Sequence, residues 1–328
     1  MSIREQFLEL LRFSGRVPPP RYESEFSDEV IQAWRSQGVL DERTPEAFFG
    51  LDAHESLPVE FGRRSKEKLV VQSEADLPAF RRRYDPSRSD IFPADWNTRL
   101  EAWHRRDFPL AFDPWNDGFF QIIGIRDGAT LGLALSLLCE KPALAEAQME
   151  HYTGYLETLI DRVVADVVPD YALFYEPIAS NHGAVISPEM YRRFVWQPLR
   201  SIVDRLERHG VAFRFMWTAG RVTPLIPLWM DAGINGIALN RGAECGIGYA
   251  RLRTEFGSSL RLLGGIDWRS VMEGPHSIDA ILERDVRPLL EQGGYIPHLD
   301  DTIRSYMPFD HFRYYRERLD HMLQQMFE

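Results

Sequence analysis

The sequence predicts an α/β protein built as a (β/α)8 TIM barrel with an irregular N-terminal excursion. Three observations favour this fold class. Apolar segments of strand length alternate with helical patterns through the second half of the chain, as is typical of parallel strands joined by right-handed crossovers. The length of 328 residues suits one such barrel. Polar residues also follow most of the apolar segments, where barrel enzymes carry their active sites.

The expected strands lie, in chain order, at residues 17–22, 109–112, 171–176, 212–218, 236–240, 260–267 and 294–298. Apolar residues recur at helical spacing between Met149 and Val167. Ser187-Pro188-Glu189 has the cap, proline and acid of a helix start, and Pro198 should kink or split that helix. Further helices are expected at Tyr249–Phe256, Ile278–Gln292 and Phe309–Met326. An open doubly wound sheet is the alternative, but no G-x-G-x-x-G motif follows any expected strand.

We expect a single domain over residues 1–328. Residues 1–105 would form the N-terminal excursion and the first barrel elements, and residues 106–328 the regular β/α repeats. The segment 41–100 is rich in Asp, Arg, Pro and Trp, which indicates irregular structure packed on the barrel.

Composition restricts the classes of partner. The chain carries 38 Lys and Arg against 49 Asp and Glu, a formal charge of −11, which argues against nucleic acid or an anionic membrane as a partner. Its two cysteines, Cys139 and Cys245, form no C-x-x-C motif, so neither a disulfide framework nor a zinc ribbon is indicated. With no signal-peptide pattern and no apolar run of membrane-spanning length, a cytoplasmic protein is expected.

Polar residues follow six expected strands. They are Asp113, Asp117, Glu176, Asn181, His182, Trp217, Thr218, Arg221, Asn240, Arg241, Glu244, Asp267, Arg269, His298, Asp300 and Asp301. A carboxylate after a strand is often a helix cap or a solvated loop residue, the reading we prefer for Asp117 and Glu244. A functional reading is preferred for Glu176, which directly follows apolar and aromatic residues. It is also preferred for His298 with Asp300, which share one face of an extended segment.

Three segments carry a family resemblance: ISPEMY (186–191), LLGGIDWR (262–269) and GGYIPHLDD (293–301). In this order and spacing they resemble the uroporphyrinogen decarboxylase superfamily, from about Arg16 to the C-terminal helix. The resemblance implies a (β/α)8 barrel with a cleft at the carboxyl ends of its strands, and it makes a homodimer plausible. It also implies one of two chemistries. One branch decarboxylates acetate side chains of a tetrapyrrole without a cofactor, and another transfers methyl groups to or from corrinoids, often with zinc.

Two departures from the family pattern narrow these implications. Methyltransferase members carry His-x-Cys at the end of the strand that here reads FMWTAG, where this chain has Trp217 and Ala219. Neither side chain can bind zinc, so a zinc-dependent methyltransferase is not expected. We expect no metal and no cofactor, and the alternative left open is that His298, Asp300 and Asp301 hold another ion. The tetrapyrrole decarboxylase carries an arginine-rich segment near its N-terminus, where this chain has only Arg16 and Arg21 around three prolines. The chain therefore lacks the arginines that would be expected to bind a substrate with many carboxylates.

The sequence thus predicts a cofactor-independent lyase, a decarboxylase acting on a small carboxylate-bearing substrate. Glu176, His298 and Asp300 are the expected acid and base groups. Arg21, Arg221 and Arg241 are the expected carboxylate anchors, and Tyr22 and Trp217 would flank a planar ring. The remaining expected substrate-binding residues are Asp113, Thr218, Asn240 and Asp301.

We expect His298 to lie near Glu176, whose carboxylate would raise the histidine's pKa. Two alternatives stay open. One is a methyltransferase that uses a corrinoid or folate donor without a zinc site, and the other is a barrel that binds a ligand without catalysis.

Overall fold

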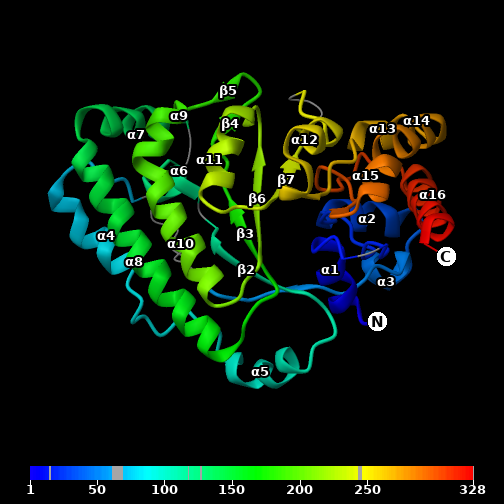
Figure 1. Cartoon of the computed structure of the whole chain (residues 1–328), viewed down its shortest axis with the longest axis horizontal. Coiled ribbons are helices and arrows are strands. Elements are labelled where there is room, and N and C mark those ends of the chain that lie inside the picture. The colour runs from blue at the N-terminus through cyan, green and yellow to red at the C-terminus, as the bar shows by residue number, and fades with distance from the viewer. Residues whose placement is uncertain (15, 61–68, 117, 126–127, 243–245, 328) are drawn as a thin grey trace.

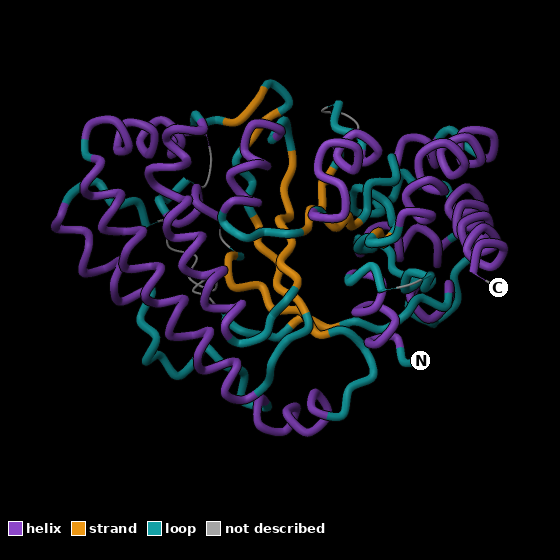
Figure 2. The backbone as a smooth tube through the Cα atoms, in the orientation of Figure 1, coloured by secondary structure: helices purple, strands orange, loops and turns teal. Residues whose placement is uncertain are grey.

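A curved sheet of seven parallel strands forms the centre of the protein (Figures 1 and 2). The computed structural model describes the whole chain except residues 15, 61–68, 117, 126–127, 243–245 and 328. In spatial order the strands are β1 (Glu55–Ser56), β2 (Leu110–Trp115), β3 (Tyr171–Tyr175), β6 (Phe213–Ala219), β7 (Gly236–Asn240), β8 (Arg261–Leu263) and β9 (Tyr295–Ile296). A separate hairpin joins β4 (Ala179–Ser180) to β5 (Gly183–Ala184).

Helices lie between and around the strands (Figure 1). They are α1 (Ile3–Leu11), α2 (Asp28–Ser36), α3 (Pro45–Phe49), α4 (Leu77–Arg83), α5 (Trp96–His104), α6 (Gly118–Ile122), α7 (Gly128–Glu140), α8 (Pro142–Asp166), α9 (Pro188–Tyr191), α10 (Gln197–Arg208), α11 (Ile226–Asp231), α12 (Tyr249–Phe256), α13 (Trp268–Met272), α14 (Pro275–Ile281), α15 (Arg287–Gln292) and α16 (Phe309–Phe327).

The expected helices form with small changes. The Ser187 side chain accepts a hydrogen bond from the backbone of Met190 and so caps α9. The expected interruption at Pro198 is a π-helical segment, Arg192–Trp196, between α9 and α10. Proline has no backbone N–H to donate to the preceding turn, so a widened turn there is reasonable. A second π-helical segment, Leu282–Val286, divides the helix expected at 278–292 into α14 and α15.

The sheet is a half-barrel and not the closed eight-stranded barrel that the sequence predicts, because the strand expected at 17–22 does not form. Pro18, Pro19 and Pro20 lack the backbone N–H that a ladder requires. Residues 21–24 nevertheless lie in the gap between β9 and β1. On one side Asp52 N donates to Arg21 O at 2.9 Å. On the other side Leu299 N donates to the Glu23 carboxylate at 2.8 Å.

Two apolar clusters lie on opposite faces of the sheet. Alternation along β3 places Tyr171 and Leu173 in the inner cluster and Ala172 and Phe174 in the outer one. Helix α1 adds Phe7, Leu10 and Leu11 to the inner cluster, beside Tyr171 and Phe213 at the starts of β3 and β6. Side chains of α1 therefore fill the interior at the amino-terminal ends of the strands, and a site can form only at their carboxyl ends.

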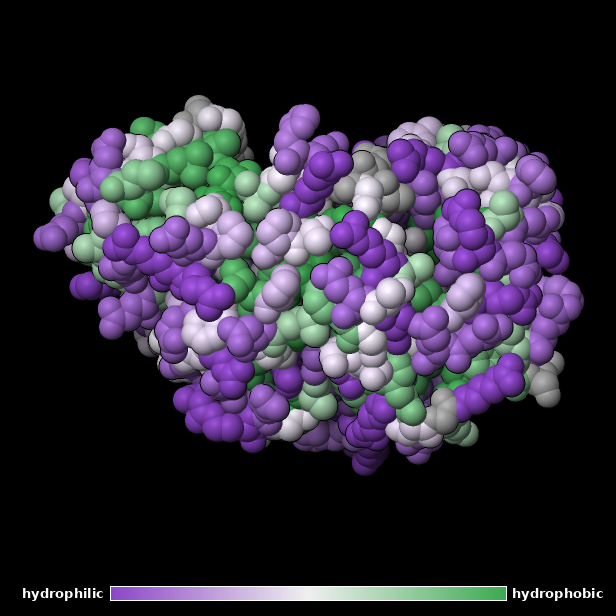
Figure 3. Space-filling model, turned by 45° about the horizontal axis from the view of Figure 1, so that its top comes forward, coloured by the Kyte–Doolittle hydropathy of each residue, from purple (hydrophilic) through white to green (hydrophobic). Residues whose placement is uncertain are grey.

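The surface is mixed in character. Most of the face in Figure 3 is hydrophilic, with a hydrophobic area at its upper left, toward the end of the molecule that carries α7. Leu133 on α7 is 48% exposed, and the free Cys139 on the same helix is also exposed. Cys245 lies outside the described residues. In the part of the chain that the structure describes, no helix has both the length and the apolar character needed to cross a membrane.

Candidate active site

A cleft of about 380 Å³ opens at the carboxyl ends of the central strands. Its lining combines apolar side chains from the strands with polar groups from the segments that follow them. It consists of Ser24, Glu25, His54, Leu173, Trp217, Ala238, Leu239, Asn240, Leu263, His298, Leu299, Asp300, Asp301 and Thr302. Five residues predicted from the sequence therefore come together here, namely Trp217, Asn240, His298, Asp300 and Asp301.

Trp217 forms an aromatic part of the cleft wall. Its ring stacks on Tyr175 of the neighbouring strand, with centroids 4.5 Å apart and planes 26° from parallel. Leu173 and Leu263 add aliphatic surface from β3 and β8. Such a wall suits the apolar or planar body of a small molecule.

Asp300 is the candidate acid of the cleft. Its side chain is only 5% exposed, and its Oδ1 accepts one hydrogen bond, from Trp268 N at 3.2 Å. Burial raises the pKa of Asp300 to about 7, and the nearby Asp267 and Asp301 act in the same direction. A carboxyl group with such a pKa keeps a proton on a large fraction of molecules at neutral pH and can donate it to a substrate.

His298 is the candidate base, contrary to the expectation that a carboxylate would raise its pKa. Burial lowers the pKa of His298, and the opposing effect of Glu23 is smaller. The ring Nδ1 lies 2.7 Å from Leu299 O, an acceptor only. The Ser24 hydroxyl lies 3.2 Å from the same nitrogen and donates to Leu299 O at 2.5 Å. With its proton on Nδ1, a neutral imidazole donates to Leu299 O, and Nε2 then keeps a lone pair that can accept a proton.

The two glycines of the LLGGID motif make room for two aromatic rings. A methyl group on Gly264 would come within 2.8 Å of His298 Cε1, and one on Gly265 within 2.4 Å of Tyr249 Cε2. Both glycines have positive φ, 81° and 82°, which side chains rarely adopt. The motif therefore fixes the His298 ring at the cleft and the Tyr249 ring on the outer side of the sheet.

A buried ion pair holds the backbone beside His298. The Glu23 carboxylate lies 3.1 Å from Arg316 of α16, and both side chains are at most 3% exposed. The same carboxylate accepts hydrogen bonds from Leu299 N at 2.8 Å and Ser24 N at 2.9 Å. Neither residue was predicted, because a single Glu and a single Arg almost three hundred positions apart carry no sequence signal of a pair.

Glu176 does not line the cleft, which corrects the expected proximity to His298. Side chains alternate along the strand, so Glu176 points to the same outer face as Ala172 and Phe174. There it is fully buried. Its carboxylate accepts hydrogen bonds from Trp115 Nε1 at 3.1 Å and Phe119 N at 3.0 Å. Burial raises the pKa of Glu176 to about 7. Sequence reasoning placed it at the right strand end but did not follow the alternation of faces.

Thr218 also faces outward, and its hydroxyl donates to Glu176 O at 2.6 Å. Asp113 accepts a hydrogen bond from Ser56 Oγ at 2.9 Å. Tyr22 is buried in the inner cluster, where its ring lies 4.5 Å from that of His54. None of these three expected substrate-binding residues lines the cleft.

The three expected arginine anchors lie outside the cleft lining. The guanidinium of Arg21 is bound to Asp320 at 2.5 Å and to Phe49 O at 3.1 Å. Arg241 pairs with Asp301 at 2.6 Å and lies over the Trp268 ring at 5.3 Å. Arg221 is exposed beyond β6. The described lining contains three carboxyl groups and no Lys or Arg, so it offers a carboxylate no direct cation.

His54 is a site residue that sequence reasoning missed. It lies directly before the two-residue strand β1, in a segment without periodicity. Burial lowers the pKa of His54, and the charge of His298 acts in the same direction. Two imidazoles therefore face one cleft. Among the described residues, no three His, Cys, Asp or Glu side chains are grouped so that they could hold a metal ion.

A parallel half-barrel with titratable groups at the carboxyl ends of its strands places the protein in the class of TIM-like α/β folds. The family model for uroporphyrinogen decarboxylase (URO-D) matches residues 126–320, more than half of the chain. The chain therefore belongs to the uroporphyrinogen decarboxylase family, in agreement with the resemblance seen in the sequence.

One solved structure shows the same fold, and a second was found at lower similarity. A methyltransferase from Methanosarcina mazei is similar over 100% of both chains, with a TM-score of 0.63 and 14% identity. A Listeria monocytogenes protein proposed to be a vitamin-B12-independent methionine synthase covers 95% of this chain and 98% of its own, with a TM-score of 0.43 and 11% identity. A search of curated proteins gave no match.

Proposed function

We propose that the protein is a lyase that removes carbon dioxide from a small carboxylic acid by acid–base catalysis without a cofactor. The observation that carries this proposal is that Asp300 and His298 line one cleft with pKa values shifted in opposite directions, upward for the acid and downward for the imidazole. Such a pair supplies a proton donor and a proton acceptor near neutral pH.

In the proposed reaction the carbon–carbon bond to the carboxylate breaks and leaves its electron pair on the substrate carbon. The Asp300 carboxyl group donates its proton to that carbon. Nε2 of His298 accepts a hydrogen bond from a hydroxyl or amine of the substrate and orients it. The apolar wall formed by Trp217, Leu173 and Leu263 solvates a carboxylate poorly and neutral carbon dioxide well, which favours its loss.

The absence of Lys and Arg from the described lining restricts the substrate class. A molecule with many carboxylates would have no cations to neutralise it there. The proposed substrate therefore carries one carboxylate on a small body, with hydroxyl or amine groups that Glu25, Asn240 and Asp301 can bind.

The test is a screen of small hydroxy, amino and aromatic carboxylic acids with the full-length protein in buffered D2O. We expect one acid to release carbon dioxide and to gain deuterium at the carbon that lost it. Asp300→Asn is the matched variant and should abolish both signals. Deuterium incorporation without carbon dioxide release, or release that Asp300→Asn does not change, contradicts the proposal.

Methyl transfer is the second candidate, because the Methanosarcina mazei protein of similar fold is a methyltransferase. A protonated Asp300 would then protonate the group that leaves the methyl carbon. The same screen separates the two when a methylated corrinoid or folate is added, since methyl transfer would consume that donor and release no carbon dioxide.

A further inference from the structure

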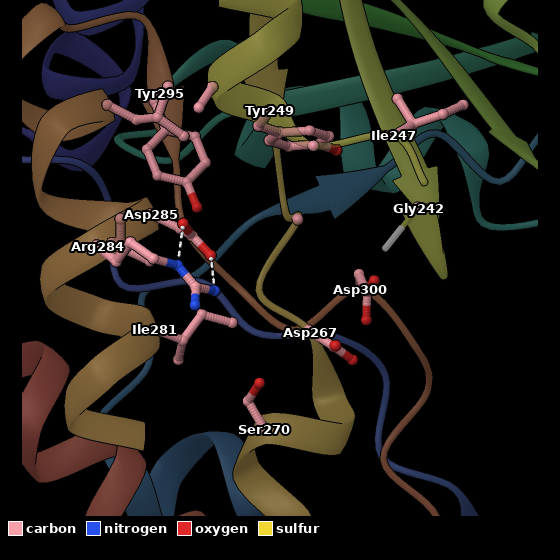
Figure 4. Close-up of a pocket in the computed structure, with 15 residues that line it drawn as sticks. Gly242, Ile247, Tyr249, Asp267, Ser270, Ile281, Arg284, Asp285, Tyr295 and Asp300 are labelled. Carbon is pink, nitrogen blue, oxygen red and sulfur yellow. Dashed lines mark hydrogen bonds and ion pairs between the residues drawn. The ribbon is translucent and has the colours of Figure 1, made fainter. Parts of the chain in front are cut away.

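A second cavity lies behind Asp300, on the outer side of the sheet (Figure 4). This side cavity has a volume of about 150 Å³, and its walls come from β9 and from helices α12 to α15. Among the described residues, Asp300 is the one that lines both the side cavity and the cleft. Asp300 thus lies between the two spaces.

Tyr295 presents a buried hydroxyl to the side cavity. The residue is 1% exposed, and Figure 4 shows its hydroxyl pointing toward Asp285. Within the described part of the chain, this hydroxyl has no hydrogen-bond partner, in contrast to Tyr249, whose hydroxyl donates to Leu263 O at 2.6 Å. A hydroxyl that faces a cavity of this size has room for a water as its hydrogen-bond partner.

The side cavity reaches solvent at its other end. Asp285 pairs with Arg284 at 2.7 Å, and their side chains are 43% and 72% exposed. A volume of 150 Å³ holds roughly five waters at about 30 Å³ each. Burial raises the pKa of Tyr295, and Tyr249, Asp285 and Asp300 add to this effect. The hydroxyl therefore keeps its proton and lies within electrostatic reach of both aspartates.

We propose that the side cavity is a proton-supply path, in which water and the Tyr295 hydroxyl connect the surface at Asp285 to the inner carboxyl group of Asp300. This inference rests on the proposed role of Asp300 as the acid of the cleft. Asp300 would be reprotonated from behind while substrate or product still fills the cleft in front.

Every proton that leaves a group on the path is replaced by one from solvent, so no other reactant is needed. Asp300 gives its proton to the substrate carbon and becomes a carboxylate. A proton from solvent enters at Asp285, and each oxygen along the chain accepts one proton and passes another on. Tyr295 takes part by accepting on its oxygen and donating its own hydrogen, so it ends each cycle unchanged. One solvent proton is consumed for each carbon dioxide released.

The first test needs no substrate. A crystal structure of the full chain should show ordered waters running from Asp285 to Asp300, with one hydrogen-bonded to the Tyr295 hydroxyl. A dry cavity, or waters that stop short of Asp300, would overturn the inference.

The second test is kinetic and uses Tyr295→Phe, which removes only the hydroxyl. With the acid found in the screen, kcat at low buffer concentration should fall about tenfold, below the 10²–10⁴-fold expected for loss of the acid itself, and KM should stay constant. Raising the concentration of imidazole buffer should restore kcat, because a small external acid can replace the path. The matched control is Tyr155→Phe, a buried tyrosine on α8, which should behave as wild type.

The outcomes separate the path from the proposed function. If Tyr295→Phe keeps wild-type kcat at every buffer concentration while Asp300→Asn is inactive, the path is wrong and the acid stands. If kcat falls but buffer does not restore it, Tyr295 has a structural role and the path is again wrong. If Asp300→Asn is fully active, the proposed function fails first.

Discussion

Gly264 lies directly against the ring of His298, so close that a methyl group in place of its hydrogen would come within 2.8 Å of Cε1. The neighbouring Gly265 stands in the same relation to Tyr249. The rings of His298 in the cleft and Tyr249 in the wall of the side cavity therefore occupy space that a side chain on Gly264 or Gly265 would fill. Substitution of either glycine should displace the ring beside it.

We expect Gly264→Ala to displace the His298 ring and to lower both stability and turnover. Gly210→Ala is the matched control, because Gly210 has a similar φ of 85° with nothing within 4 Å of the added carbon. The control should lose about 1–2 kcal/mol of unfolding free energy from its backbone conformation alone. Gly264→Ala should lose about 1–3 kcal/mol more from overpacking. If urea denaturation gives the same loss of unfolding free energy for Gly264→Ala and Gly210→Ala, the contact between position 264 and the His298 ring does not restrict the side chain there.

Asp300→Asn should stabilise the protein at high pH and not at low pH. The pKa of Asp300 is raised to about 7 in the folded state from about 3.9 in an unfolded chain. The stability that its bound proton contributes is present below about pH 4 and is lost as the pH rises through about 7. Asparagine stays neutral, so the difference in unfolding free energy should grow across this window, by at most about 1.4 kcal/mol per pH unit.

Urea denaturation at pH 5 and pH 8 measures this difference. The exposed Asp310→Asn serves as the control, since the Asp310 side chain is 77% exposed. A gain for Asp300→Asn that is the same at both pH values would contradict the raised pKa.

His298 should be neutral at pH 7. Burial lowers the pKa of His298 below its ordinary value of 6.5, so its NMR titration should have a midpoint below that value, with Nδ1 as the protonated nitrogen. His298→Asn roughly keeps the size of the side chain and removes the Nε2 acceptor that orients the substrate, and it should lower kcat/KM by about 2–10-fold, the effect of losing one hydrogen bond of about 0.5–1.5 kcal/mol. A midpoint above 6.5 would restore the original expectation of an imidazolium acid.

Breaking the Glu23–Arg316 ion pair should be costly. Removing one partner of a buried pair leaves the other charge uncompensated, at about 3–5 kcal/mol, so we expect Glu23→Gln and Arg316→Met each to lower the unfolding free energy by this order. The double variant should lose clearly less than the sum of the two, since it leaves no single buried charge. Additive losses would mean that the two groups do not interact.

Arg21→Ala should lower stability without weakening substrate binding. Arg21 binds Asp320 and Phe49 O and lies outside the cleft lining. The pair is 41% and 25% exposed, so the loss should be small, about 1 kcal/mol or less. An unchanged KM for the acid found in the screen is expected, and a large rise in KM would return Arg21 to the role of an anchor.

Local sequence patterns predicted six of the sheet's strands, because buried parallel strands are continuous apolar runs, and several helices of the second half, but not α2 to α7. They predicted the wrong state for residues 17–22, where apolar character conflicts with three prolines. The same patterns located His298 and Asp300 at a strand end. They did not reveal that Glu176 faces outward. That orientation follows from the alternation of side chains along β3, and it can be assigned only when the face of one residue in the strand is known. They also could not reveal His54 or Glu23, whose positions depend on contacts between distant segments.

The ion pair that holds the cleft also joins the two ends of the chain, since Glu23 and Arg316 are 293 positions apart. Bringing such distant segments together is slow, because the loop entropy is lost before the contact forms. Glu23 gains its buried charge partner only when α16 is in place to supply Arg316. We therefore expect the backbone beside His298 to be set late in folding, after the central strands have paired. A chain synthesised without α16 would hold most of its sheet and still lack an assembled cleft.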